Sequence, residues 1–160
     1  MFSLKWWEAV KYSKKLFSES NWSKAVYAYH VVANMCMVQD ELTEEQSKEQ
    51  IELAKCVHMP FNTFVNCQPS LTFMFLSRNI PSWKQRFGGK SLPQEKFSIV
   101  KAERFLKQGY LVLPAIEVVY AWNGFAIIGK SQELTEGILA LVKKEKKNIK
   151  ARKGCIYERS

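Results

Sequence analysis

Apolar residues recur along most of this chain at the spacing that places them on one face of an α-helix. Between residues 6 and 17 this spacing holds approximately for Trp6, Ala9, Val10, Leu16 and Phe17. A second run extends from Trp22 to about Val38, and the polar residues 18–21 separate the two runs. We therefore predict two antiparallel helices joined by a short turn, with Ser20 or Asn21 as the N-cap of the second.

Residues 39–57 predict a further helix. Thr43 and Gln46 form the Thr-x-x-Gln pattern of a capping box, in which each side chain bonds the other residue's backbone N–H. Residues 57–82 contain three prolines, and their apolar residues keep no sustained period. Because proline interrupts both helices and strand pairing, we expect an irregular insertion there.

Three more helices are predicted, over residues 93–107, 114–129 and 131–142. A proline begins each of the first two, where its missing N–H removes no intrahelical bond, and Ser131 caps the third. With seven glycines in 160 residues and almost no hairpin dipeptides, no strand is predicted. The chain is thus expected to be all-α, with six to seven helices paired as antiparallel hairpins.

The second predicted helix carries the residue spacing of a tetratricopeptide repeat (TPR). Its matching positions are Trp22, Ala25, Tyr29 and Val32. The spacing reflects close packing, since a small alanine lets two helices touch while aromatic side chains fill the space around it. On the same register Ala9, Tyr12 and Leu16 stand at the aromatic or aliphatic positions of the repeat's first helix, and Ser13 stands where a glycine is usual. The pattern predicts helical hairpins stacked as a short TPR-like solenoid.

Several longer strings resemble the tetratricopeptide-repeat protein 39 family. They are residues 22–27, 88–97, 101–104, 114–125 and 129–130. The resemblance covers about residues 5–56 and 81–142, whereas residues 57–80 look like an insertion and the sequence leaves the pattern from about Lys143. The resemblance implies an all-helical scaffold that binds other proteins, with no established catalytic residues. It also implies that the chain is part of a longer protein.

Positive charge is concentrated towards the C-terminal end. The chain carries 24 Lys and Arg against 15 Asp and Glu, a formal charge of +9. Residues 143–160 hold eight of these cations and two of the acids, so residues 1–142 carry only +3. We therefore divide the chain into a helical domain, residues 1–142, and a basic tail, residues 143–160.

Three roles fit the basic tail: a solvated helix end, a contact for nucleic acid or another acidic surface, or a nuclear-localisation cluster. No aromatic residue lies between Lys143 and Lys153, so this stretch offers no side chain to stack on bases. Specific nucleic-acid binding is therefore not expected.

Residues 124–131 match the P-loop pattern G-x-x-x-x-G-K-[ST] letter for letter. A P-loop wraps phosphate with backbone N–H groups while its lysine reaches the β- and γ-phosphates. Here the four middle residues are Phe, Ala, Ile and Ile, which would expose bulky apolar side chains in a loop. A helix that ends near Gly129, with Ser131 capping the next helix, accounts for the same letters. Nucleotide binding is kept as the less favoured alternative.

Cysteine and histidine do not occur at the spacing of metal ligands or of a nucleophile and its base. They are Cys36, Cys56, Cys67, Cys155, His30 and His58. Without a Cys-x-x-Cys pair we expect reduced thiols and no zinc site, in a cytoplasmic or nuclear protein, and we expect His30 to be structural. We assign no catalytic, cofactor-binding or metal-ligating residue.

Two apolar stretches, residues 56–77 and 109–129, are long enough to test as membrane spans. Prolines and polar residues interrupt the first, and the second contains an acid, Glu117, which costs roughly 2 to 3 kcal/mol at the centre of a span. No membrane span is expected.

The function expected is protein binding without catalysis, through the concave surface that the first helices of the repeats line. In chaperone-type repeats a Lys and an Asn on this surface clamp a C-terminal carboxylate, and here Val10 and Lys14 occupy those places. Half of the clamp is therefore missing. We expect Lys11 and Lys14 to contact an acidic partner.

Overall fold

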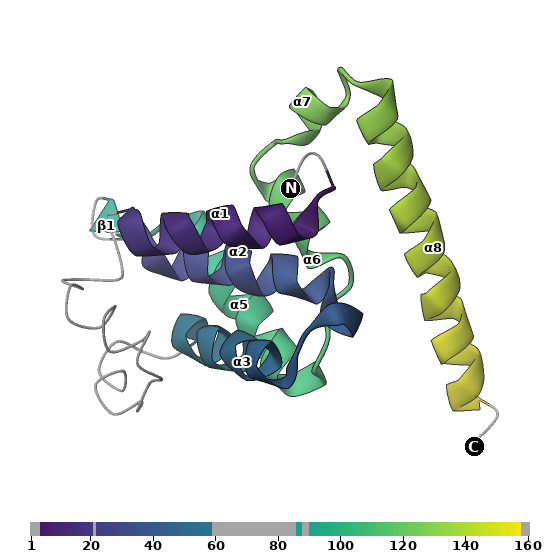
Figure 1. Ribbon diagram of the computed structural model, residues 1–160, viewed down its shortest axis with the longest axis horizontal. Coiled ribbons are helices and arrows are strands. Elements are labelled where there is room, and N and C mark those ends of the chain that lie inside the picture. Colours follow the sequence, from purple (N-terminus) through teal and green to yellow (C-terminus); the bar gives the residue numbers. More distant parts are fainter. Residues whose placement is uncertain (1–3, 21, 59–85, 88–89, 158–160) are drawn as a thin grey trace.

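The computed structural model describes residues 4–20, 22–58, 86–87 and 90–157 of the 160-residue chain (Figure 1). In that part the α-helices are α1 (Trp6–Glu19), α2 (Lys24–Cys36), α3 (Glu44–His58), α5 (Pro93–Gln108), α6 (Pro114–Ala121), α7 (Phe125–Ile128) and α8 (Gln132–Tyr157). A short 3₁₀ helix, η1 (Gln39–Glu41), precedes α3. The predicted all-α class is confirmed.

Helices α1 and α2 form the predicted antiparallel hairpin (Figure 1). The second helix begins at Lys24, two residues later than the apolar pattern indicated. Ser20 does not cap it, because its Oγ accepts a bond from the backbone N–H two residues later, at 3.1 Å. Ser23 holds the N-cap position, and its hydroxyl donates to Oε1 of Glu95 in α5, 2.5 Å away. The predicted cap at Ser20 is wrong, and Asn21 lies outside the described residues.

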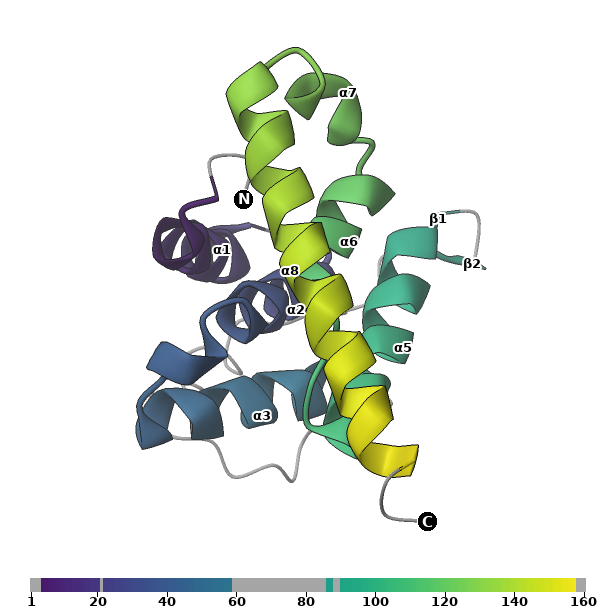
Figure 2. The same cartoon turned by 90° about the vertical axis from the view of Figure 1, so that its right-hand side faces the viewer.

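Helix α2 is the centre of the fold and packs against α1, α3, α5 and α6. Figure 2 shows it nearly end-on among these neighbours. Nine of its 13 residues are buried, which explains why its sequence is apolar on almost every side rather than along one stripe. Ala28 and Ala33 have no exposed surface, so neighbouring helices approach closely there.

The second pair of helices, α3 and α5, packs together and against α2, so it stacks on the first pair. The capping box predicted at the start of α3 is present. The Thr43 N–H donates to Gln46 Oε1 at 3.0 Å, and the Gln46 N–H donates to Thr43 Oγ1 at 3.3 Å. This cap fixes the start of α3 at Glu44, so the single helix predicted over residues 39–57 is instead η1 followed by α3.

The connection between α3 and α5 lies mostly outside the described residues. Of the irregular insertion predicted over residues 57–82, residues 57–58 belong to α3, and residues 59–82 fall outside the described part. Before α5, strands β1 (Arg86–Phe87) and β2 (Lys90–Ser91) pair in antiparallel fashion. The prediction of no strand is therefore wrong at this short hairpin, where a Gly-Gly dipeptide, a common turn signal, separates the strands.

The apolar run that predicted one helix over residues 114–129 forms two helices, α6 and α7. Asn123 between them has a φ of 54°, a left-handed conformation that interrupts an α-helix. Asparagine tolerates this conformation, and Asn-Gly is a dipeptide typical of turns. The apolar period continues across the turn, so periodicity alone did not locate the break.

The first half of α8 packs against α6, α7 and the N-terminal segment. The cluster that holds it comprises Leu4, Trp6, Leu113, Ile116, Val119, Ile128, Leu134 and Ile138. Gly137 allows this close approach, since a Cβ there would lie 2.5 Å from Cδ1 of Leu4. The helix then continues through residues 143–157 at the edge of the molecule, so most of the basic tail is helical (Figure 1).

Candidate functional site

A groove of about 240 Å³ runs along α1. The residues that line it are Lys5, Glu8, Ala9, Tyr12, Ser13 and Leu16 along α1 and His30 of α2. The α1 positions recur every three or four residues, so they share one side of the helix. Tyr12 and Leu16 are 65% and 45% exposed. The groove therefore presents two accessible apolar side chains, one turn apart.

His30 lines the groove from α2, and its imidazole belongs to an aromatic cluster. Its Nε2 accepts a hydrogen bond from Nε1–H of Trp122 at 3.2 Å, so Nε2 carries no proton. Tyr27 and Trp122 make edge contacts with the imidazole, and Trp22 contacts both of those rings. Burial lowers the pKa of His30 to about 4, so the ring is neutral at pH 7. His30 is thus a structural residue, as the sequence predicted.

A buried hydrogen bond joins α1, at the groove, to α2. Ser13, which lines the groove, is only 6% exposed, and its Oγ accepts a hydrogen bond from Nδ2 of Asn34 in α2 at 3.1 Å. The same amide nitrogen donates to the His30 carbonyl at 2.8 Å. A serine at the position where the repeat pattern has glycine thus holds α1 to α2 by a hydrogen bond.

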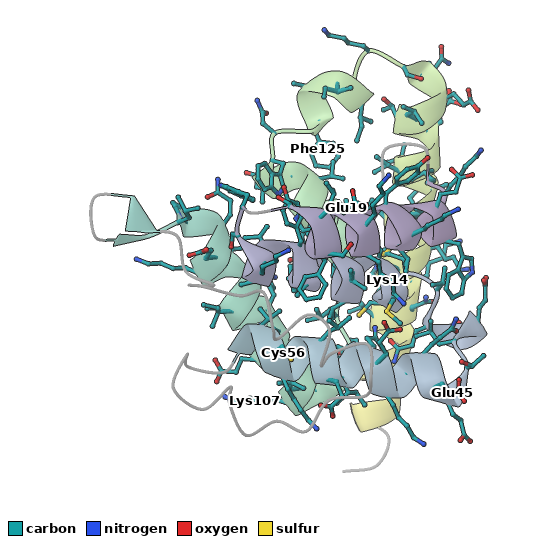
Figure 3. The ribbon with its side chains drawn as sticks, turned by 60° about the vertical axis from the view of Figure 1, so that its left-hand side comes forward. Lys14, Glu19, Glu45, Cys56, Lys107 and Phe125 are labelled. Carbon is teal, nitrogen blue, oxygen red and sulfur yellow. The ribbon has the colours of Figure 1, made fainter. Side chains whose placement is uncertain are left out.

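The two predicted contact residues, Lys11 and Lys14, lie on α1 but not in the groove. Lys14 is two residues from both Tyr12 and Leu16, which places it about 160° away around the helix. Its Nζ bonds Glu49 Oε2 in α3 at 2.7 Å, and Figure 3 shows the lysine between the two helices. Lys11 is exposed. The structure therefore separates the predicted lysines from the groove.

The exposure of the groove residues was missed at the sequence level. Tyr12 and Leu16 stand at packing positions of the repeat pattern, where burial is expected, yet both are exposed. A signal did exist, since Tyr12 is two residues from the buried Val10 and therefore on the far side of the helix. The contact of Trp122 with His30 joins residues 92 apart in sequence, and no local pattern predicts it.

The P-loop match does not form a phosphate-binding loop. Four of its residues are α7, and every backbone N–H from Ala126 to Ser131 donates to a carbonyl three or four residues earlier. These are the groups that a P-loop must leave free to wrap phosphate. Ser131 Oγ accepts a bond from the Leu134 N–H at 3.4 Å, consistent with the predicted cap of the last helix.

The described part of the chain shows no metal centre, and its Cys36 thiol is not reactive. No group of three or more His, Cys, Asp or Glu side chains in that part is arranged to hold a metal ion. Burial raises the pKa of the Cys36 thiol to about 12, and its Sγ accepts a bond from Nε2 of Gln50 at 3.2 Å. Such a thiol stays protonated at pH 7 and is a poor nucleophile. Among the described helices, none is both long and apolar enough to cross a membrane.

Comparison with known proteins identifies relatives over nearly the whole chain. The family described as Iml2/Tetratricopeptide repeat protein 39 matches residues 1–158, including the two segments, 57–80 and 143–158, that were expected to depart from the family. The Caenorhabditis elegans protein named tetratricopeptide repeat protein ttc-39B is 28% identical over 138 residues, which is 86% of this chain. The chain spans only 20% of that relative's length. No solved structure matches the chain.

Proposed function

The chain belongs to the Iml2/tetratricopeptide repeat protein 39 family, and on this basis we propose that it is a non-catalytic scaffold that binds another protein through the groove on α1. The observation that carries the proposal is the pair Tyr12 and Leu16, which stay 65% and 45% exposed beside each other in a groove. Tyrosine is enriched among the residues that contribute most to protein interfaces. The partner would cover this pair.

The chemistry of the groove supports binding over catalysis. His30, its only histidine, is neutral and accepts a hydrogen bond, so its Nε2 is not free to take a proton. Lys5 and Glu8 at one end pair with each other at 3.5 Å, and both side chains are more than half exposed. Exposed charges beside apolar side chains are the composition of an interface rim next to its apolar centre.

We propose in addition that Lys11 and Lys14 contact acidic groups of the partner at the side of α1 that faces α3. Lys14 already pairs with Glu49, and the two side chains are 42% and 41% exposed. Exposed pairs of this kind contribute only about 0 to 1 kcal/mol, so a carboxylate of the partner can replace Glu49 at little cost. Lys11, one turn away, is exposed.

The test compares two double variants of exposed apolar residues. Tyr12→Ala/Leu16→Ala alters the groove, whereas Ile51→Ala/Val100→Ala removes side chains of similar exposure (41% and 53%) on α3 and α5. Each form is immobilised and exposed to an extract of cells that express the protein, and bound proteins are quantified by mass spectrometry. We expect proteins retained by the wild type and the control to be lost with the groove variant. Equal recovery by both variants would contradict the proposal.

A further inference from the structure

Five lysines lie close together around the middle of α8, between residues 143 and 150. They are Lys143, Lys144, Lys146, Lys147 and Lys150, and every one is exposed. At 100° per residue, Lys143, Lys147 and Lys150 lie on the side opposite the buried Ile138, and the other two flank them. We call these five residues the lysine face.

The lysine face is not neutralised by the rest of the described chain. None of its five members forms an ion pair with a described carboxylate. Glu145, the acid within this stretch, is partly buried, and its Oε2 accepts a bond from Nδ2 of Asn148 at 2.9 Å. At 100° per residue Glu145 lies on the side of Ile138, off the lysine face.

Position and shape make the lysine face accessible to a flat surface. Figure 1 shows α8 at the edge of the molecule, with the helical bundle on one side of it only, and Figure 2 shows it crossing in front of the other helices. Its 26 residues form one continuous helix. Leu139 and Val142, which are 48% and 41% exposed, precede the lysines and share a side of the helix with Lys146. An apolar strip thus borders the cations.

We propose that this side of α8 binds the surface of an anionic phospholipid membrane. Lysines near such a surface each strengthen binding roughly fivefold, and the adjacent Leu139 and Val142 suit the boundary between headgroups and acyl chains. Nucleic acid fits less well, since the face has no aromatic side chain to stack on bases and is bordered by an apolar strip. The proposal uses α8 alone and does not depend on the groove on α1.

The test is co-sedimentation of the whole chain with vesicles of phosphatidylcholine, with or without phosphatidylserine. The lysine-face variant replaces Lys143, Lys144, Lys147 and Lys150 by Gln. The control variant removes the same net charge from exposed lysines of other helices: Lys11, Lys15, Lys48 and Lys96, each to Gln. All eight positions are exposed, and circular dichroism verifies that both variants keep the wild-type helix content.

Binding to phosphatidylserine vesicles should fall more than about tenfold in the lysine-face variant and change only about twofold in the control. Leu139→Gln/Val142→Gln should weaken binding several-fold while leaving its salt dependence in place. An equal loss of vesicle binding in both lysine variants would overturn the proposal, because net charge, and not the lysine face, would then determine binding. So would absence of vesicle binding, equal binding to pure phosphatidylcholine, or binding to duplex DNA alone.

Discussion

Trp122 at the end of α6 donates a hydrogen bond from its indole N–H to Nε2 of His30 in the middle of α2, 3.2 Å away. The bond joins the central helix to the last helix of the bundle that packs on it. It needs an unprotonated Nε2, because a protonated imidazole has no acceptor. This bond between α6 and α2 therefore depends on the charge state of His30.

The first prediction concerns acid sensitivity. The pKa of His30 is about 4 in the folded chain and near 6.5 when unfolded, so the unfolded state binds more protons between these values. The contribution of His30 to the unfolding free energy is therefore fully present above about pH 6.5. It is lost as pH decreases to 4, which lowers the unfolding free energy by roughly 2 to 3 kcal/mol. Urea unfolding at a series of pH values measures this. In His30→Gln, which does not titrate, the slope over this window should be shallower; an unchanged slope would contradict the assignment.

A second prediction concerns the buried pair that joins the start of α2 to α5. Ser23 and Glu95 are each 1% exposed; Ser23 bonds Oε1 of Glu95, and Oε2 has no hydrogen-bond partner among the described residues. Ser23→Ala removes the donor and leaves a buried carboxyl group unsatisfied, so we expect a loss of about 1 to 3 kcal/mol in unfolding free energy. Ser23→Ala/Glu95→Met removes both polar groups and should recover much of that loss. A double variant no more stable than Ser23→Ala would refute this explanation.

The central position of α2 gives a third prediction. Ala28 has no exposed surface, so Ala28→Leu must displace neighbouring side chains and should cost about 1 to 3 kcal/mol. Ala140 on α8 is exposed, and Ala140→Leu should stay within about 0.5 kcal/mol of the wild type. Chemical denaturation compares the two. Similar stabilities for both variants would show that α2 is not packed on all sides.

Nucleotide binding is the subject of a fourth prediction. Because the backbone N–H groups of residues 126–131 are all engaged in helical and turn bonds, MgATP and MgGTP should leave the Tm of the chain unchanged. The same nucleotides should leave the Tm of Lys130→Ala unchanged as well. A saturable rise in Tm for the wild type that Lys130→Ala abolishes would mean that the loop opens to bind phosphate.

Local sequence signals were sufficient to predict most of the helices. The capping box at Thr43 and the left-handed Gly109 after α5, whose φ is 73°, fix helix ends through bonds between near neighbours, and both could be predicted from the sequence. The break at Asn123 shows the limit of periodicity, because apolar residues continue in register on both sides of it. The Asn-Gly dipeptide there, and not the hydrophobic pattern, determines where the helix ends.

The candidate site depended on contacts between distant segments. Lys14, a predicted contact residue, forms a hydrogen bond with Glu49 of another helix, 35 residues away in sequence. The residues around either position do not indicate that pairing. Tyr12 and Leu16 fit a packing pattern, yet no helix covers their side of α1 in the described chain, so both remain exposed. Periodicity shows which residues share a face, but only the packing of the other helices decides whether that face is covered.

Site-specific photo-crosslinking tests the central claim, protein binding through the groove on α1, most directly. A photoreactive phenylalanine analogue is placed at Tyr12, at Leu16 or, as a control, at Lys48, which is exposed on α3. Crosslinking is carried out in cells that express the whole protein. The account predicts that positions 12 and 16 capture the same protein and that position 48 does not. Capture at position 48 without capture at 12 or 16 would contradict it.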